Sequence, residues 1–551
     1  MESIPYHEPS IKLISVLSGF LLTLNLFNYG LNKIAFCGLI GQVVLGIAWG
    51  TPGGKLLDTE LEEVIMQLGY LGLILLVFEG GLATSFKSMM ANIWLSTGVA
   101  ITGIAMPIGI SFVLRLGATP LQAFTAGAAL CSTSLGTTFT ILGTSGLSAT
   151  RLGVVLTSAA MIDDVVGLIM VQVIANLGSE FEPVTVIRPV FVSLAFAVFI
   201  PVLCKFVALP ITLRLNQMRE KNPKSKLANV LNLRRTAFLI HTTLLLGLVI
   251  AGTYAGTSSL LAAYIAGAAV SWWDSEVPHV TFRPGPVQEG TGPTQDAGGS
   301  SASRSHIHEA PNSESEGSSL GVQVFDHYYQ PVVEHILKPF FFASIGFSIP
   351  ITQMFSGSVV WRGVIYTLLM TVAKLVCGLW LVPIPNSFQT AMELVQKLSL
   401  RMAGKSLTPG AQCTEISPNN PETQESDHQE DSGFRDTPAT ETSQPVVVRN
   451  STPKPESPKS LYPAGIIGLG MVARGEIGFL VSSLAQSKGI FDSQSGSQSQ
   501  GLFLVVTWAI TLCTVIGPIC VGLLVNRVRK LESTRVQGRS GSGNVLGAWG
   551  V

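Results

Sequence analysis

The chain has 551 residues, of which 47% are hydrophobic and only 12% are charged, and its mean hydropathy is +0.46. Because soluble domains carry about 25% charged residues, this composition excludes an ordinary soluble protein and predicts a polytopic membrane protein. The 34 basic residues balance the 34 acidic ones, so no excess of charge points to nucleic acid as a partner.

Apolar segments long enough to cross a bilayer recur along the chain. A membrane-spanning helix needs about 20 mostly apolar residues, and about 13 segments approach that length. In chain order they are residues 11–29, 34–49, 64–81, 93–114, 121–142, 152–176, 189–207, 236–254, 258–273, 336–349, 359–382, 463–485 and 502–525. The sequence therefore predicts an all-α membrane protein with about 13 transmembrane helices.

Two basic segments indicate how these spans are oriented. The segment after the seventh span, RLNQMREKNPKSKLANVLNLRR, holds seven Lys or Arg residues, and NRVRKLESTRVQGR follows the last span. Both fall on one side of the membrane, and basic loops face the cytoplasm. We expect a cytoplasmic C-terminus and an N-terminus that is outside or lumenal, in the plasma membrane or an endomembrane. No basic region precedes the first apolar run, so that span is expected to act as the insertion signal.

Two polar insertions interrupt the second half of the chain. Residues 276–321 are rich in Gly, Ser and Pro, and residues 406–459 are rich in Ser, Thr, Pro, Glu and Gln. Neither composition can bury a core, so both are predicted to be disordered cytoplasmic loops. The preceding residues 388–405 could form a basic amphipathic helix on the membrane surface or a plain linker. Residues 526–551 are predicted to be a basic cytoplasmic tail.

A weak internal repeat divides the spans into two blocks. The third span ends in LILLVFEGGLATSF and the tenth contains KPFFFASIGFSIP, while CSTSLGTTFTILG in the fifth corresponds to GLGMVARGEIGF in the twelfth. Two six-span blocks separated by one linker span have opposite orientations, which is the inverted-repeat plan of secondary transporters. The predicted domains are a first repeat at residues 11–177, a linker helix at 189–207 and a second repeat at 236–525.

Two adjacent aspartates, Asp163 and Asp164, lie inside the sixth span in TSAAMIDDVVGLIMVQ. One carboxylate at the centre of a membrane helix costs about 3 kcal/mol, so such residues normally face a partner or an aqueous path. Successive helical residues point about 100° apart, so the two side chains cannot face one small site equally. A buried carboxylate can take up either a cation or a proton. The alternative is a polar patch satisfied by Ser and Thr.

Hydroxyl side chains crowd the fifth span in CSTSLGTT, which includes Thr133 and Ser134. Such a stretch can unwind beside a cavity, because its hydroxyls satisfy the freed backbone groups. The exposed oxygens then suit an alkali cation. The alternative is close helix packing through small residues.

Further charged residues inside the predicted spans need partners. Lys374 lies near the middle of the eleventh span, too deep to reach the interface easily, and Asp163 is its natural partner, which leaves Asp164 for an ion. Arg474 and Glu476 do not share a helix face, so we expect each to neutralise the end of a broken helix rather than to contact the ion. Glu79, near a span end, is either a residue of a cytoplasmic funnel or simply interfacial.

These motifs together resemble one known family. The set LLVFEGGL, CSTSLGTT, TRLGVVLTSAAMIDDVVGLIM, FFFASIGFSI and MVARGEIGFL is similar to the second class of monovalent cation:proton antiporters. That class includes NapA-type sodium/proton antiporters and KefC-type potassium efflux systems, and the resemblance extends over all the predicted spans. The two long polar insertions depart from the compact bacterial pattern and suggest a eukaryotic, fungal member.

The resemblance implies a NhaA/NapA-like fold and a site. It implies two inverted six-helix repeats with broken, crossing fifth and twelfth spans, a homodimer, and an elevator-like movement that carries the ion. Asp164 matches the carboxylate that binds the monovalent cation, and Asp163 matches the neighbour that pairs with a lysine. Lys374 matches that lysine, and Thr133 and Ser134 match the polar pair of the unwound segment. KefC-type proteins carry a cytoplasmic nucleotide-binding domain after the membrane part, and because only a short tail follows the last predicted span here, gating through such a domain is not expected.

The sequence therefore predicts a secondary antiporter that exchanges Na⁺ or K⁺ for H⁺ in the lipid bilayer, with no cofactor. The alternative on the same scaffold is a transporter that couples a cation or proton to an organic solute. A channel or a sensor that does not transport is a third possibility. An enzyme is not expected, because we find no nucleophile–base arrangement, metal cluster or phosphate loop.

Overall fold

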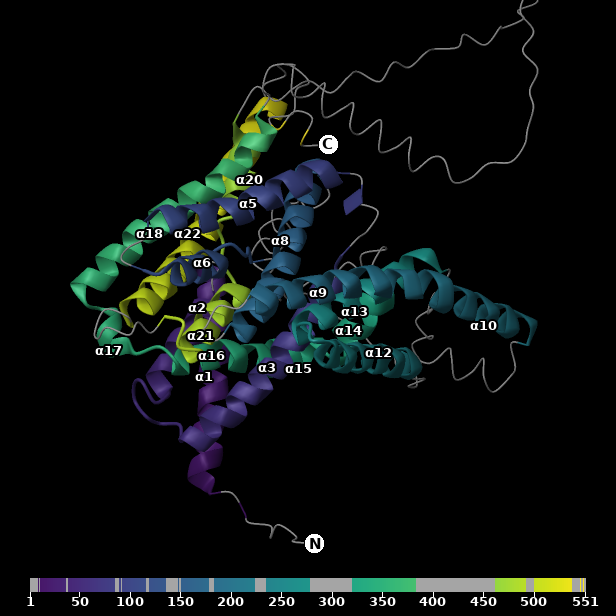
Figure 1. The fold of residues 1–551 in the computed structure, drawn as a ribbon, viewed down its shortest axis with the longest axis horizontal. Coiled ribbons are helices and arrows are strands. Elements are labelled where there is room, and N and C mark those ends of the chain that lie inside the picture. Colours follow the sequence, from purple (N-terminus) through teal and green to yellow (C-terminus); the bar gives the residue numbers. More distant parts are fainter. Residues whose placement is uncertain are drawn as a thin grey trace, which may run out of the picture. The chain divides into compact units, whose positions relative to one another are not determined.

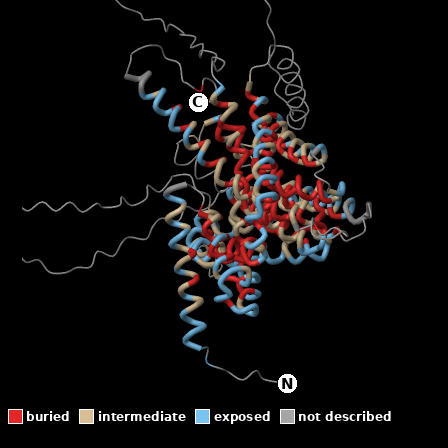
Figure 2. The backbone as a smooth tube through the Cα atoms, turned by 90° about the vertical axis from the view of Figure 1, so that its left-hand side faces the viewer, coloured by how far each residue is buried: buried red, intermediate tan, exposed pale blue. Residues whose placement is uncertain are grey.

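The structure is a computed structural model that describes residues 8, 10–35, 38–84, 89–90, 92–114, 118–134, 147, 150–177, 183–222, 234–277, 320–382, 461–491, 500–537, 546 and 549. Every regular element in these residues is a helix (Figure 1). Buried residues gather where the helices meet, and exposed residues line the outermost helices (Figure 2). The predicted loops and the predicted helix at 388–405 lie largely or wholly outside the described residues.

The first half of the chain supplies the helices of the predicted first repeat and linker. They are α1 (Ile11–Ala35), α2 (Gly38–Trp49), α3 (Thr59–Leu82), α5 (Ile93–Leu114), α6 (Pro120–Ala129), α8 (Arg151–Asn176), α9 (Pro183–Leu203), the π-helical turn η1 (Cys204–Ala208) and α10 (Leu209–Lys221). The start of α6 follows from its sequence TPLQ. Thr119 and Gln122 form a reciprocal capping box, and Pro120 occupies the first turn, where no amide hydrogen is needed.

The second half supplies the remaining helices of the described part of the chain. It contains α12 (Arg234–Ala255), α13 (Ser259–Glu276), α14 (Leu320–Tyr328), α15 (Gln330–Val332), η2 (Val333–Leu337), α16 (Lys338–Phe347), α17 (Ile351–Met354), α18 (Gly357–Leu375), the 3₁₀ turn η3 (Val376–Leu381), α20 (Tyr462–Gly470), α21 (Glu476–Ser487) and α22 (Gln500–Gln537). The ends of α13 and α14 are tied together, because Asp274 Oδ2 accepts a hydrogen bond from the Gly321 amide.

Eight helices in the described part of the chain are long and apolar enough to cross a membrane. The most buried of them are those at Arg151–Asn176 and Gly501–Ser533, and Gly38–Trp49 is a shorter apolar helix. The all-helical membrane architecture is confirmed, while the total of about 13 spans stays a prediction. Two predicted spans do not appear as long helices because the chain leaves the helix after Ala129, within the predicted span 121–142, and again between Gly470 and Glu476, within 463–485.

Two helices extend beyond their predicted ends. The predicted span 189–207 continues through η1 and α10 to Lys221, and the predicted span 502–525 continues in α22 to Gln537. The basic segments that follow the apolar runs were predicted to be a cytoplasmic loop and a cytoplasmic tail. They contain Leu, Arg, Gln, Lys and Glu, which favour helices, and Pro is absent between residues 211 and 222 and between 519 and 537.

Helices α2 and α16 approach each other at a pair of glycines. A Cβ atom on Gly46 would overlap the backbone carbonyl of Ala343, and one on Gly346 would overlap the carbonyl of Val43. The two backbones are thus in direct contact, which small residues at a helix crossing permit.

The same contact recurs between α13 and α3. A Cβ atom on Gly267 would overlap the carbonyl of Phe78, and one on Gly81 would overlap the carbonyl of Tyr264. In both crossings each glycine faces the carbonyl of the residue three positions before the partner glycine. Helix α2 therefore packs on α16 as α13 packs on α3, which is the correspondence expected of two repeated halves.

Candidate functional site

Helix α8 carries the two aspartates near its centre. Its first turn is fixed by Thr150, whose hydroxyl oxygen accepts a hydrogen bond from the Gly153 amide. Asp163 is 0% exposed and Asp164 is 6% exposed. Because neighbouring helical residues point about 100° apart, the two carboxylates meet different surroundings.

Asp163 forms a fully buried ion pair with Lys374 of α18, as the sequence predicts. The Lys374 Nζ atom lies 3.0 Å from Asp163 Oδ2, and both side chains are 0% exposed. The ammonium also donates to Thr133 Oγ1 at 3.1 Å and to the carbonyl oxygen of Cys131. Its three protons thus meet three acceptors. Thr133 Oγ1 in turn donates to Asp163 Oδ2 at 2.6 Å, so this carboxylate is neutralised by local partners.

Asp164 has a hydroxyl partner but no ion pair with any residue that the structure describes. Ser132 Oγ donates a hydrogen bond to Asp164 Oδ1 over 3.3 Å. The charged group that acts most strongly on Asp164 is Glu476, which is also acidic. A buried carboxylate without an ion-pair partner among the described residues favours the uptake of a positive ion, either a proton or a metal cation.

The hydroxyl partners come from a segment where the chain has left the helix. Helix α6 ends at Ala129, and residues 132–134 have no regular structure. Beside them run residues 473–475, which separate α20 from α21, and the Ser134 amide donates to the Ala473 carbonyl at 2.9 Å. The end of α6 therefore lies against the break between α20 and α21, and both pack on α8 (Figure 1).

Two charged residues of the MVARGEIGF motif occupy the ends of these interrupted helices. Arg474 is 0% exposed, and its Nη1 donates to the carbonyls of Cys131 at 3.3 Å and Ser132 at 3.0 Å, just beyond the end of α6. Glu476 lies in the first turn of α21. The C-terminus of a helix carries a partial negative charge and its N-terminus a partial positive one. A cation at the first and an anion at the second are therefore both stabilised by the helix dipole. These positions support the electrostatic role expected from the sequence.

Glu79 lies near the end of α3 and is half-buried. Its charged neighbours are Lys338, Asp326, Glu334 and Glu476. Glu476 therefore acts on both Glu79 and Asp164, and the acidic groups extend from the candidate site toward α14–α16.

The predicted residues that meet directly are Asp163, Thr133 and Lys374, with Arg474 bonded to the same carbonyl as Lys374. Ser134 reaches the neighbouring segment through its backbone amide. The residue that the sequence argument left out of the site is Ser132, which bonds to Asp164. Successive side chains in extended chain point to opposite sides, and this alternation could have indicated that adjacent hydroxyls serve adjacent aspartates.

Comparison with known proteins agrees with this architecture over part of the chain. Residues 12–281 match the family described as sodium/hydrogen exchanger, transmembrane. The high-affinity Na⁺/H⁺ antiporter NhaS3 of Synechocystis sp. is 30% identical over 143 residues, covering 25% of this chain and 31% of NhaS3. The Na⁺/H⁺-K⁺ antiporter GerN of Bacillus cereus is 30% identical over 152 residues, covering 27% of this chain and 39% of GerN.

A third relative and a solved structure complete the comparison. The probable Na⁺/H⁺ antiporter GerT of Bacillus cereus is 30% identical over 165 residues, covering 29% of this chain and 44% of GerT. The structure of the sodium proton antiporter MjNhaP1 from Methanocaldococcus jannaschii superposes with a TM-score of 0.48 at 12% identity, over 94% of this chain and 99% of that one.

The matching segments span less than half the length of each curated relative. The matching family is one of transporters, not enzymes. This chain is an integral multi-pass membrane protein, and its residues 12–281 are similar to the transmembrane region of the sodium/hydrogen exchanger family.

Proposed function

We propose that this protein is a secondary antiporter that exchanges a monovalent cation, Na⁺ or K⁺, for protons, and that both ions compete for Asp164. The observation that carries the proposal is the unequal treatment of two adjacent carboxylates. Asp163 is matched by a fully buried ammonium at 3.0 Å, whereas Asp164 has no basic partner among the described residues and keeps a small exposed fraction. A single carboxylate that must release the cation before it takes up the proton couples the two fluxes.

The described site contains oxygen donors of the kind that alkali cations prefer. Asp164 supplies the negative charge and Ser132 supplies a hydroxyl oxygen 3.3 Å away. The non-helical residues 132–134 and 473–475 bring backbone carbonyls to the same region. Carbonyls of interrupted helices are suited to Na⁺ or H⁺ coupling in secondary transporters. The names of GerN and NhaS3 support the same pair of substrates.

The finer architecture is part of this proposal. The matched crossings of α2 with α16 and of α13 with α3 support two inverted repeats. Their backbone contacts favour a rigid unit made of α2, α16, α3 and α13. Helix α8, which carries Asp164, would move against this unit in an elevator-like cycle. A homodimer, a cytoplasmic C-terminus and a fungal origin are retained as predictions of the sequence.

Reconstituted protein tests the exchange directly. The purified chain is placed in liposomes that contain a pH-sensitive dye, a proton gradient is imposed, and Li⁺, Na⁺ or K⁺ is added outside. We expect Na⁺ or K⁺ to dissipate the gradient with saturating kinetics. We expect Asp164→Asn to abolish exchange, because the amide carries no charge and takes up no proton in this range.

A matched acidic variant separates the site from general charge effects. Asp58 is exposed before α3 and makes no side-chain capping bond, so Asp58→Asn is expected to transport normally. Size-exclusion profiles verify that both variants are folded. Normal exchange by Asp164→Asn would refute the site, and a wild-type protein that moves none of the three cations would refute the function.

A further inference from the structure

Two residues beyond α22 pack back onto the helices that carry the candidate site. Leu546 is 1% exposed and belongs to a cluster of buried apolar side chains from α5, α8, η3, α20 and α22. Trp549 packs against the same cluster, and its amide donates to the Leu546 carbonyl at 3.2 Å, which places the two residues in one turn. We call Leu546 and Trp549 the returning pair.

Trp549 meets α8 at its first residue, Arg151. The Arg151 Cζ atom lies 4.7 Å from the centre of the Trp549 ring, which is the geometry of a cation–π contact. Arg151 Nε also donates to Asn92 Oδ1 at 3.3 Å, just before α5. A cation in the first turn of a helix is disfavoured by the helix dipole. The ring and the amide oxygen therefore stabilise a charge that α8 alone would disfavour.

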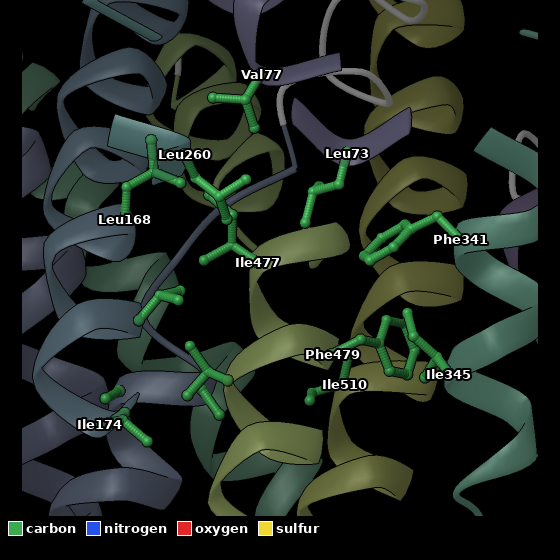
Figure 3. Close-up of a cluster of buried hydrophobic side chains, with 14 of the residues drawn as sticks. Leu73, Val77, Leu168, Ile174, Leu260, Phe341, Ile345, Ile477, Phe479 and Ile510 are labelled. Carbon is green, nitrogen blue, oxygen red and sulfur yellow. The ribbon is translucent and has the colours of Figure 1, made fainter. Parts of the chain in front are cut away.

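Helix α8, which carries Asp164, runs between two clusters of buried side chains. Its second half packs with the rigid unit, because Leu168 and Ile174 share a cluster with Leu260 of α13 (Figure 3). Its first half packs in the cluster of Leu546, which contains no side chain of α2, α3, α13 or α16 in the part of the chain that the structure describes. The returning pair therefore packs on helices outside the rigid unit.

These helices have to keep their relative positions while the ion site moves. Helix α5 packs on α8 in the predicted first repeat, and α20 packs on α22 in the predicted second repeat. The non-helical segments beside Asp164, residues 132–134 and 473–475, come one from each repeat. A shift of α8 along the break between α20 and α21 would separate the oxygen donors around Asp164. The returning pair joins α8 to α20 and α22 about three and a half turns before Asp164.

We infer that the start of α8, together with α5, α20 and α22, is a docking surface for the returning pair, and that exchange at Asp164 needs this surface to be occupied. The second part rests on the proposed exchange. Among the described residues, the contact is made by only two side chains beyond α22, so it can open while the helices stay folded. The docked pair is a detachable brace that makes these helices move as one unit.

Point variants remove the two parts of the contact. Trp549→Ala deletes the ring, Leu546→Ala deletes the buried anchor, and Trp549→Phe keeps a smaller aromatic face. Trp361→Ala is the matched control, because Trp361 of α18 is 66% exposed. Each purified variant is measured for deuterium uptake in residues 150–156 and, in liposomes, for its maximal rate and KM. Both measurements are repeated with an excess of a peptide of residues 538–551.

We expect deuterium uptake in residues 150–156 to be about tenfold faster in Trp549→Ala and Leu546→Ala, because the first turn of α8 opens more often. Uptake in α13 should stay unchanged, since that helix belongs to the rigid unit. The maximal rate should fall about fivefold with a KM within about twofold of wild type, since the contacts of the ion itself remain. Trp549→Phe should lie between Trp549→Ala and wild type, and Trp361→Ala should match wild type.

The peptide distinguishes docking from fixed internal packing. By mass action, the native peptide in excess should restore the uptake and the maximal rate of both alanine variants to within about twofold of wild type. The same peptide with Leu546→Ala and Trp549→Ala should restore neither quantity.

Three results would overturn the inference. They are unchanged deuterium uptake in both alanine variants, a maximal rate that stays at the wild-type value in both, and a native peptide that restores neither quantity. Failure of the proposed function is a separate outcome, in which wild type moves none of the tested cations. Deuterium uptake then still decides whether the docking surface exists: faster uptake that the native peptide reverses supports it, and unchanged uptake refutes it.

Discussion

The protein contains two kinds of helix crossing that are held together in opposite ways. Where residues 132–134 meet residues 473–475, the chain is not helical and the contacts are polar, with Lys374 and Arg474 bonded to the same carbonyl of Cys131. Where α2 meets α16 and α3 meets α13, the helices stay regular and their backbones touch at glycines.

In the proposed exchange cycle, the polar crossing would move and bind the ion, and the glycine crossings would form the fixed support. The polar crossing contains the fully buried charged side chains Lys374 and Arg474. A buried charge is tolerated only while its partners are in place, so removing one partner leaves the other group buried and unpaired. The glycine crossings have no charge to rearrange, and their packing leaves no space for another carbon atom. A site that exchanges ions benefits from the first kind of contact, and a frame against which it moves benefits from the second.

The largest expected effect comes from disturbing the frame. Gly46→Val should prevent stable folding, with a loss of more than about 4 kcal/mol, because the new side chain would overlap the Ala343 carbonyl. Gly247→Ala is the matched control: its added methyl meets open space, so it should leave stability unchanged or raise it by up to about 1 kcal/mol. Thermal unfolding followed by size-exclusion chromatography measures both. An unaltered melting temperature for Gly46→Val would remove the distinction between the crossings.

The second effect comes from breaking the buried ion pair. Asp163→Asn and Lys374→Met should each cost about 3–5 kcal/mol, because each leaves the partner charge buried and unpaired. The double variant should lose less than the sum of the two, with a coupling of at least about 1 kcal/mol. Chemical denaturation of the four proteins completes the cycle. Additive losses would mean that the 3.0 Å contact contributes no stability of its own.

The smallest effect separates the two hydroxyl residues beside the aspartates. Ser132→Ala should raise the KM for the cation about threefold and leave stability almost unchanged, because Asp164 loses one weak partner. Thr133→Val should instead lower stability by about 1–2 kcal/mol, because Thr133 bonds to both Asp163 and Lys374. Transport and melting curves of both variants test this. If Ser132→Ala instead lowers stability and Thr133→Val instead raises the KM, the roles proposed for the two residues are wrong.

Several features of the site could be predicted from residue types alone. A lysine and an aspartate deep in apolar segments require partners, and this energetic argument predicts that Lys374 pairs with one of the two adjacent aspartates. The family resemblance supported the choice of Asp163. The density of Gly, Ser and Thr in CSTSLGTT and of Gly in GLGMVARGEIG indicated where the helices are interrupted. Charges flanking such a break are expected to oppose the helix dipoles, as Arg474 and Glu476 do.

Other features depend on register, which the sequence does not contain. Which hydroxyl meets Asp164 depends on how residues 132–134 are placed along α8, and the residue that meets it is Ser132 rather than Thr133. Helices α10 and α22 continue past their apolar segments because helix formers, not hydrophobicity, decide where a helix ends. Glycine is common in membrane helices, so its abundance could not single out Gly46 and Gly346 as a contact.

The bond between Asp274 and the Gly321 amide has a practical consequence for engineering. It brings together the two points between which residues 278–319 are inserted. The entropic cost of closing a loop grows only with the logarithm of its length, so a doubling of the insertion adds about 0.6 kcal/mol. A fluorescent protein or an affinity tag inserted between these two points is therefore expected to leave α13 and α14 in place.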